Sequence, residues 1–289
     1  MKYAFIQDHR EEFSVDLMCK VLEVSSSGFY DWKGRDNSVK QAKRIALVAT
    51  IQQVHAVSRK NYGSPRVFKA LQSMGEKISK ATVERLMRQN EIRAKTKKKF
   101  KATTNSKHSL PVAPNVVNRQ FGIGQANKLW CSDITYLWTD EGWLYLAAVI
   151  DVGTRKIVGW SMDERMTKKL VLDALDMAVK RQNPGRGLVH HSDRGSQYAS
   201  KAYRRRLWRY GMIASMSRKG DCWDNAVMES FFHTLKVENV YHERYKTRRE
   251  AMSSVFEWIE VFYNRQRLHS TLGYVSPECY EKKVFLKCA

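Results

Sequence analysis

Three consecutive strand-like runs constrain the fold of this chain more than any other feature. Residues 143–151 form a continuous apolar run that ends in an acid, which is typical of a strand buried on both faces of a sheet. Residues 129–138 and 156–162 flank this run, and Gly142 and Gly153 lie in the intervening segments, where glycine favours turns. We therefore expect an antiparallel meander of three strands.

The segment after the meander alternates helices with short strands. Apolar residues recur there at helical spacing, at Val171, Ala174, Leu175 and Ala178. Strand-like runs at 187–191 and 212–216 are separated by a basic helix over 200–210, and a further helix begins near Asp224. The resulting order, βββαβαβα, is that of a ribonuclease-H-like core. We expect an α/β fold in which a mixed five-stranded sheet is flanked by helices.

Three carboxylates occupy defined positions in this expected fold. Asp133 lies within the first strand, Asp193 lies just past the fourth, and Glu229 lies on the last helix, with 35 residues between Asp193 and Glu229. Because the first and fourth strands would be neighbours, the two aspartates can converge, and a helical glutamate can reach both. Mg²⁺ prefers hard oxygen ligands, and two such ions can assist both oxygens of a phosphodiester displacement. The pattern predicts a catalytic, metal-binding triad.

The charge of the chain indicates its partner. Lys and Arg outnumber Asp and Glu by 51 to 29, which gives a net charge of +22. A surplus of this size favours nucleic acid, with an anionic membrane surface as the second choice. The longest apolar stretch, Trp143 to Ile150, is far shorter than the roughly 20 residues of a membrane span, and residues 1–13 have no apolar signal-peptide core. We expect a cytoplasmic protein without membrane contact, associated with the nucleoid through DNA.

The cysteines and the histidine pair predict no structural zinc. Five cysteines are scattered along the chain, and none forms a C-x-x-C pair, so neither a disulfide framework nor a cysteine zinc site is expected. For His190-His191, packing at a strand end is a better interpretation than metal binding.

The first hundred residues predict two small helical units. Residues 1–37 contain a helical run at 15–22 and a turn into a second short helix, which could form a helix-turn-helix or a small helical hairpin that packs on a neighbouring part. Residues 40–94 predict three helices, with Ser64 capping the second and Ser79 capping the third. The third helix is basic and carries Arg85 and Arg88, which we expect to contact DNA phosphates in a helix-turn-helix-like domain. The alternative is a solvated basic face on a structural bundle.

The remaining boundaries follow from composition. Residues 95–127 form a basic linker with Lys97, Lys98 and Lys99 at its centre, which could follow a DNA backbone or serve as a solvated tether. Residues 128–240 form the catalytic core. Residues 241–289 form a C-terminal helix and a basic tail, in which Arg267 is a candidate DNA contact.

The helix of Glu229 offers one more candidate. Lys236 lies two turns after Glu229 on the same face, where it could contact a DNA end or, alternatively, balance Glu229 and Glu238 at the surface. Two other acids have structural interpretations, because Asp151 ends a strand and should cap the next turn, and Asp224 should be the N-cap of the Glu229 helix.

Five dense signatures follow one another along the second half of the chain. They are Trp130-x-x-Asp133-Ile134-Thr135-Tyr136, Asp151-x-x-x-Arg155-Lys156-Ile157-Val158-Gly159-Trp160, His191-Ser192-Asp193-Arg194-Gly195-Ser196-Gln197-Tyr198, Asp224-Asn225-Ala226-x-x-Glu229-Ser230-Phe231-Phe232-x-x-Leu235-Lys236 and Tyr263-Asn264-x-x-Arg267-x-His269-x-x-Leu272-Gly273-x-x-Ser276-Pro277. Together they resemble the signatures of a known family, the catalytic OrfB transposases of the insertion-sequence-three family, whose DDE core is integrase-like. Upstream, residues 24–32 and Tyr62-Gly63-Ser64-Pro65-Arg66 resemble the N-terminal helical modules of that family.

This resemblance implies a DNA transposase that acts at the terminal inverted repeats of an insertion sequence. It implies Asp133, Asp193 and Glu229 as the metal-binding triad, with two Mg²⁺ ions, or Mn²⁺ in their place, and Lys236 as the nearby basic residue. Hydrolysis would free a 3′-OH, which then attacks another phosphodiester. The expected partners are double-stranded DNA of the element ends and the target, further copies of the chain on that DNA, and an upstream OrfA protein or a frameshift fusion with it.

Two rival interpretations remain at the level of sequence. One is an inactive DNA-binding regulator, against which the presence of all three acids argues. The other is a ribonuclease-H-like nuclease without strand transfer, against which the basic helical modules argue. The zinc module of retroviral integrases, with its His-x-His and Cys-x-x-Cys, is not in the sequence.

Overall fold

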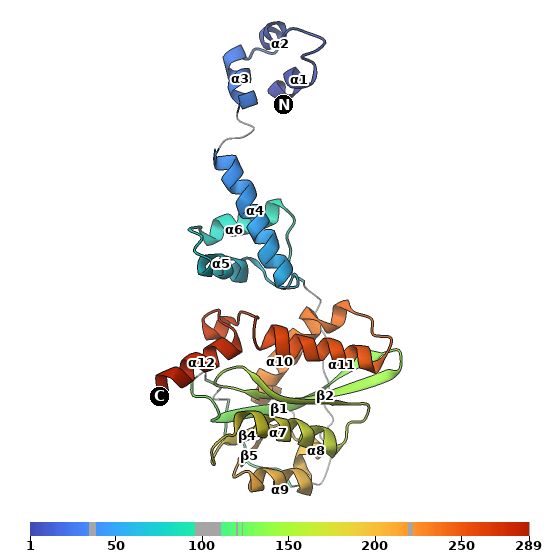
Figure 1. Cartoon of the computed structure of the whole chain (residues 1–289). Helices are drawn as coiled ribbons and strands as arrows, with labels where there is room; N and C mark the ends of the chain where they lie inside the picture. Colours follow the sequence, from blue (N-terminus) through green and yellow to red (C-terminus); the bar gives the residue numbers. More distant parts are fainter. Residues whose placement is uncertain (35–38, 96–110, 120, 123, 219–221, 289) are drawn as a thin grey trace.

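The computed structural model describes residues 1–34, 39–95, 111–119, 121–122, 124–218 and 222–288 (Figure 1). Its helices and strands form two small helical units at the N-terminal end, followed by an α/β core that the C-terminal helices complete. No helix in the described part of the chain is long and apolar enough to cross a membrane.

The first unit contains three short helices around a small core. These are α1 (Lys2–Asp8), α2 (Val15–Val21) and α3 (Ser26–Gly34), and they bury Ile6, Met18 and Phe29. The sequence predicted the second and third helices but not α1. Ser14 caps α2, since its side chain accepts a hydrogen bond from Leu17 N–H.

The second unit contains α4 (Val39–Val57), α5 (Ser64–Ser73) and α6 (Lys80–Gln89), as the sequence predicted. The cap of α6 at Ser79 is confirmed, because its hydroxyl accepts a hydrogen bond from Thr82 N–H. The cap of α5 was predicted one residue too late: Gly63 is the N-cap, and Ser64 is the first helical residue. Proline is tolerated at position 65 because it has no N–H, and an N–H in the first turn would have no acceptor within the helix.

The core sheet has the order β3-β2-β1-β4-β5. Strands β1 (Leu129–Thr139), β2 (Gly142–Asp151) and β3 (Ile157–Asp163) form the expected antiparallel meander. Strands β4 (Val189–Ser192) and β5 (Ile213–Met216) add in parallel on the other side of β1. The predicted mixed five-stranded sheet is confirmed. The predicted turn cap at Asp151 is confirmed too, since its carboxylate accepts a hydrogen bond from Thr154 N–H.

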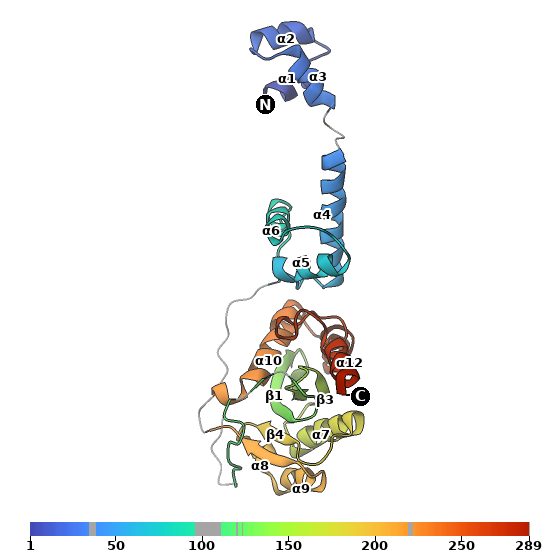
Figure 2. The same cartoon turned by 90° about the vertical axis from the view of Figure 1, so that its left-hand side faces the viewer.

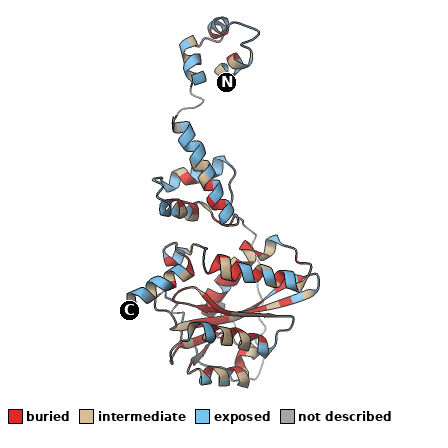
Figure 3. Ribbon diagram, viewed as in Figure 1, coloured by how far each residue is buried: buried red, intermediate tan, exposed pale blue. Residues whose placement is uncertain are grey.

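Helices cover both faces of the sheet (Figures 1 and 2). On one face, α7 (Lys168–Gln182), the short α8 (Ser196–Ala199) and α9 (Lys201–Arg209) enclose an apolar core that includes the fully buried Trp130. On the other, α10 (Ala226–Glu238) and α11 (Arg248–Glu257) pack over Leu137 and Leu146. Buried residues concentrate in the sheet and on the inner faces of these helices (Figure 3).

The C-terminal part is more structured than the expected helix and basic tail. A π-helical segment, Trp258–Tyr263, continues α11 and is largely buried. Single 3-10 turns occur at Cys222–Asn225, Val240–His242 and Ser270–Leu272, and α12 (Pro277–Cys288) follows the last of them.

Candidate active site

The register of the two central strands brings Asp133 and Asp193 together. Strand β1 pairs in parallel with β4, and the last paired residues are Ser132 and Ser192. The next residue on each strand is an aspartate, so the two acids lie side by side where β4 ends. This is the convergence that the sequence predicted for neighbouring strands.

Local hydrogen bonds hold both carboxylates in place. An Asp133 carboxylate oxygen accepts a hydrogen bond from Ile134 N–H at 2.7 Å, and one from Asp193 accepts from Gly195 N–H at 2.9 Å. The turn after Asp193 is tight, because a Cβ on Gly195 would lie only 3.0 Å from the same Asp193 oxygen. A side chain at position 195 would therefore press on this carboxylate.

Glu229 and Lys236 face the aspartates from α10. The pKa of Asp133 is raised well above its usual value, first by burial and then by the negative charges of Asp193 and Glu229, while Lys236 opposes the shift. Burial also raises the pKa of Glu229, and it lowers the pKa of Lys236, which Asp133 counteracts. The charge of Asp133 is therefore influenced by Asp193, Glu229 and Lys236.

The donor set suits a hard divalent cation. Carboxylate oxygens are its preferred ligands, and a cation would offset the repulsion that raises the pKa of Asp133. Among the described residues, no three Asp, Glu, His or Cys side chains lie close enough together to form a complete metal-binding cluster. The residues that could hold such a cation are therefore Asp133, its neighbour Asp193, and Glu229, whose charge acts on Asp133.

Asp224 fixes the loop before α10 through hydrogen bonds to other side chains, and it does not cap the helix as predicted. Asp224 is fully buried and accepts hydrogen bonds from the Arg218 guanidinium at 2.9 Å, from Arg119 at 3.1 Å and from Asn115 at 2.9 Å. These bonds, led by those from Arg218, hold its pKa well below the usual range. The N-cap of α10 is Asn225 instead, so the predicted cap at Asp224 was wrong.

Two further polar residues near the aspartates were not predicted from the sequence. The Asn225 amide donates a long hydrogen bond of 3.4 Å to Ser132 C=O, beside Asp133. The Tyr198 ring is 2% exposed, and the negative charges of Asp133 and Asp193 add to burial in raising the pKa of its hydroxyl. Both residues belong to the quoted signatures, which was the only available signal for them.

The histidine pair packs in the sheet, in agreement with its predicted structural role. His190 hydrogen-bonds to the hydroxyls of Ser132 and Tyr203 at 2.9 and 3.0 Å. Burial lowers the pKa of His190 to about 3, so its imidazole is neutral at physiological pH. His191 is held between Ser215 and Ser217.

The candidate DNA contacts occupy very different positions. Arg85 and Arg88 lie exposed on α6, where a phosphate could reach them, whereas Lys97, Lys98 and Lys99 lie outside the described residues. Arg267 does not have the exposed position that a DNA contact requires. It is 5% exposed, and its guanidinium donates two hydrogen bonds, of 2.8 and 2.7 Å, to the Glu238 carboxylate. A side chain buried in this way cannot reach a DNA phosphate.

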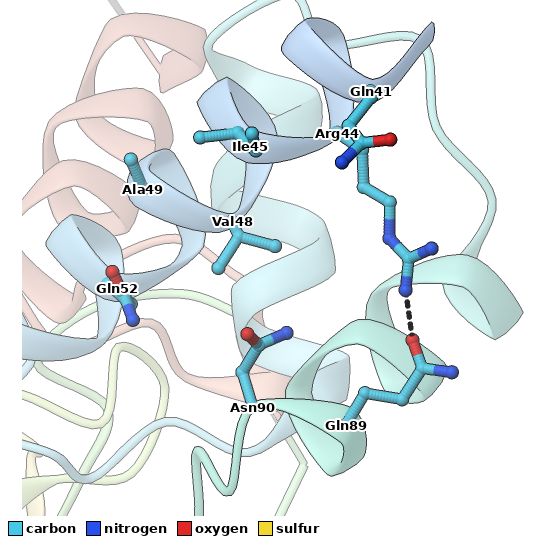
Figure 4. A pocket seen from close by; sticks show the side chains of 8 residues that line it. All are labelled: Gln41, Arg44, Ile45, Val48, Ala49, Gln52, Gln89 and Asn90. Carbon is cyan, nitrogen blue, oxygen red and sulfur yellow. Dashed lines mark hydrogen bonds between the residues drawn. The ribbon is translucent and has the colours of Figure 1, made fainter. Parts of the chain in front are cut away.

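A surface hollow lies away from the carboxylates, between α4 and α6 (Figure 4). Ile45, Val48 and Ala49 line one side of it, and Arg44 donates a hydrogen bond of 2.6 Å to Gln89 at another. The lining residues include no acid, histidine or cysteine, so they offer neither a general base nor a carboxylate ligand.

Comparison with known proteins agrees with this geometry. The integrase core domain family matches residues 124–222, a second integrase core domain family matches 229–285, and an HTH-like domain family matches 41–100. The transposase InsF of insertion sequence IS3A from Escherichia coli strain K12 is 44% identical over 285 residues, which cover 98% of this chain and 99% of InsF. The chain belongs to the IS3 transposase family.

Other relatives of this transposase are similar over most of their length. The 31 kDa protein of insertion element IS600 from Shigella sonnei is 47% identical over 266 residues, 92% of this chain and 98% of that protein. Among solved structures, the catalytic core of BIV integrase is 17% identical with a TM-score of 0.43, and covers 56% of this chain and 99% of its own. The integrase core domain matches and the InsF relative show that the transposase is an enzyme that acts on DNA phosphodiester bonds.

Proposed function

We propose that this transposase hydrolyses DNA at the terminal inverted repeats of an insertion sequence and then joins the freed 3′ end to another strand. In the second step the 3′-OH attacks a phosphodiester, a new P–O bond forms, and the 3′-oxygen of the attacked strand leaves. The single observation that carries the proposal is the placement of Asp133 and Asp193 side by side at the end of β4, facing the helix that carries Glu229. These are the three acids of the family signatures, and they come from two neighbouring strands and one helix.

In this proposal the three carboxylates are the ligands of two Mg²⁺ ions, with Mn²⁺ as an alternative. The bound ions supply activation of the attacking oxygen and neutralisation of the leaving oxygen. Asp133 and Asp193 are held by Ile134 N–H and Gly195 N–H, so their orientation is set before DNA arrives. Lys236 lies beside Asp133, where its ammonium can contact a DNA phosphate.

The partners in this proposal are double-stranded DNA of the element ends and the target. Arg85 and Arg88 on α6 contact phosphates, as do Lys97, Lys98 and Lys99, and these contacts position the chain on DNA without reading its sequence. Because two element ends react together, the chain acts in this proposal as a homo-oligomer assembled on DNA. The upstream OrfA protein, separate or fused by frameshifting, completes recognition of the ends, and the nucleoid in the cytoplasm is the place of action.

The domain division in this proposal follows the chemistry. Residues 1–37 and 40–94 are helical units, 95–127 is a basic linker, 128–240 is the catalytic core, and 241–289 is the C-terminal part. The helical units bind DNA and the core carries out the cleavage and transfer.

A plasmid that carries the flanking inverted repeats tests the proposal. The chain, alone and fused to its upstream frame, is expressed beside a Glu229→Gln control, and joined ends are amplified. Joined ends from the wild type alone are expected. Intact DNA binding without product from either the chain or the fusion would favour an inactive regulator, and cut ends that never join would favour a nuclease without strand transfer.

A further inference from the structure

Three large aromatic side chains lie exposed at the end of the β1–β2 hairpin. Tyr136, Trp138 and Trp143 are 39%, 57% and 44% exposed, and we call them the hairpin aromatic cluster. The Tyr136 and Trp143 rings are 5.0 Å apart at 82°, and those of Trp138 and Trp143 are 4.8 Å apart at 77°. The three rings thus pack edge to face and form one continuous, partly exposed aromatic surface.

The strand pairing explains why these rings lie together on one face. Trp138 pairs with Trp143 across the hairpin, and paired residues point to the same side of a sheet, as do residues two apart. Leu144, next to Trp143, points to the opposite side, where it is fully buried against Tyr245 and Ala251. The hairpin is therefore covered on the side of α11 and exposed on the side of the cluster (Figure 1).

The cluster adjoins the candidate active site. Lys236 Nζ lies 5.0 Å from the centroid of the Tyr136 ring, and the same ammonium interacts with Asp133. Tyr136 follows Asp133 by three residues on β1, a separation of about 10 Å at the rise of a strand. The two side chains leave opposite faces of the strand. Because β1 has no pairing with β4 beyond Ser132, this edge of β1 is open, and Lys236 interacts with both residues there.

Charge near the cluster favours an anionic polymer. The acids of the hairpin turn are already engaged, since Asp140 pairs with Arg244 at 3.4 Å and Glu141 accepts a hydrogen bond from Arg248 N–H at 2.8 Å. Lys236 borders the rings, and the chain as a whole carries +22. Aromatic faces beside cationic groups are the arrangement with which proteins hold unpaired nucleic-acid bases.

We propose that the hairpin aromatic cluster stacks against unpaired bases of the DNA strand whose phosphate enters the carboxylate site. This inference rests on the proposed function. Bases that open next to a phosphodiester at the half-buried Asp133 and Asp193 are stabilised by stacking on Trp138 and Trp143. Since every base has an aromatic face, the site accepts any sequence, which suits flanking DNA that differs at every insertion.

A binding experiment tests the cluster without requiring catalysis. The full chain with Glu229→Gln, in metal-free buffer, is titrated with end-sequence duplexes that carry 2-aminopurine next to the cleavage point. One duplex is fully paired, and the other has three unpaired bases at that position. Trp138→Ala and Trp143→Ala are compared with Trp208→Ala, which removes an equally large and 80% exposed ring from α9.

The expected result is preferential loss on the unpaired substrate. Trp138→Ala should weaken binding of the unpaired duplex about tenfold, the scale of one lost stacking contact. Stacking on the Trp138 ring should quench the fluorescence of 2-aminopurine in the unpaired duplex, and this quenching should be lost in Trp138→Ala. This variant should leave the paired duplex unaffected, and Trp208→Ala should change neither. Trp138→Phe should recover most of the binding, since a ring face is restored.

Two results would overturn the inference. One is equal binding of the unpaired duplex by Trp138→Ala and by the unsubstituted chain. The other is a Trp138→Ala variant that binds unpaired DNA normally but differs from the unsubstituted chain in oligomeric state, measured by sedimentation without DNA. The rings would then form a contact between copies of the chain. Neither result bears on strand transfer, so the proposed function is judged separately by joined ends.

Discussion

At the residue scale, Asp133 carries an electrostatic conflict. Burial and the charges of Asp193 and Glu229 raise its pKa, so its ionised form destabilises the fold. Such a conflict is typical of functional sites, where groups are arranged for a ligand rather than for stability. A bound cation would reverse it.

The first prediction follows from this conflict. Asp133→Asn should raise the midpoint of thermal unfolding by a few degrees in metal-free buffer at neutral pH, since it removes one of the repelling charges; about 1 kcal/mol corresponds to roughly 2–4 °C for a domain of this size. Mg²⁺ should raise the midpoint of the wild type but not that of the variant. Scanning calorimetry measures both. A less stable Asp133→Asn would show that this carboxylate stabilises the fold.

Asp224 shows the opposite electrostatics and gives a pH prediction. Its pKa is lowered in the folded chain, so it contributes stability above the unfolded-state value of about 3.9 and loses this contribution as the pH falls through its folded-state pKa. Asp224→Asn should be less stable at pH 7 by about 1–3 kcal/mol, as for hydrogen bonds to a charged group. The difference should shrink toward pH 3. Urea denaturation at both pH values measures it, and a constant difference would contradict the assignment.

At the element scale, the strands and most helices were predictable because each carries its own periodicity. The apolar run of β2 and the cap at Ser79 are local signals, and the convergence of Asp133 and Asp193 follows from strand order alone. The burial of Arg267 was not predictable, because its partner Glu238 is 29 residues away in the sequence. The role of Asp224 was missed because its local signal for capping yields to Arg218, six residues before it, and to Arg119, 105 residues away.

Helix α6 carries the prediction that belongs to this scale. Arg85→Ala and Arg88→Ala should each weaken DNA binding for all sequences alike, and each should reduce the slope of log K against log salt by about 1, the effect of one lost phosphate contact. Arg205→Ala, an exposed arginine on α9, is the matched control. Titrations at several salt concentrations decide it. Unchanged slopes would make the basic face of α6 a solvated surface.

At the scale of the whole molecule, an ion cluster joins the second helical unit to the core. Glu238, the last residue of α10, binds Arg267 and lies 3.7 Å from Arg66 at the start of α5. The Tyr62 hydroxyl donates a hydrogen bond to Gln266 C=O and accepts one from Leu268 N–H. Two family signatures, one at 62–66 and one beginning at Tyr263, thus meet at the end of the helix that carries Glu229.

This cluster makes Glu238 a structural carboxylate. Glu238→Ala would leave two adjacent, largely buried arginines without their anion, and it should destabilise the chain by about 3–5 kcal/mol, the usual cost of breaking a buried ion pair. The second helical unit should also become more sensitive to limited proteolysis. Glu243→Ala, an exposed acid close by, is the control for both measurements. If Glu238→Ala lost no more stability than the control, the ion cluster would not stabilise the junction between the second helical unit and the core.

The three carboxylates Asp133, Asp193 and Glu229 are proposed to act together as one metal-dependent centre for strand transfer. The decisive measurement is joining of a labelled element-end duplex to a target duplex in vitro, with and without Mg²⁺, by the wild type and by Asp133→Asn, Asp193→Asn and Glu229→Gln. We expect joining by the wild type with Mg²⁺ only, and none by any variant, although all four proteins bind the end duplex equally. Joining by any one of the three variants, or by the wild type in chelator, would contradict a shared centre.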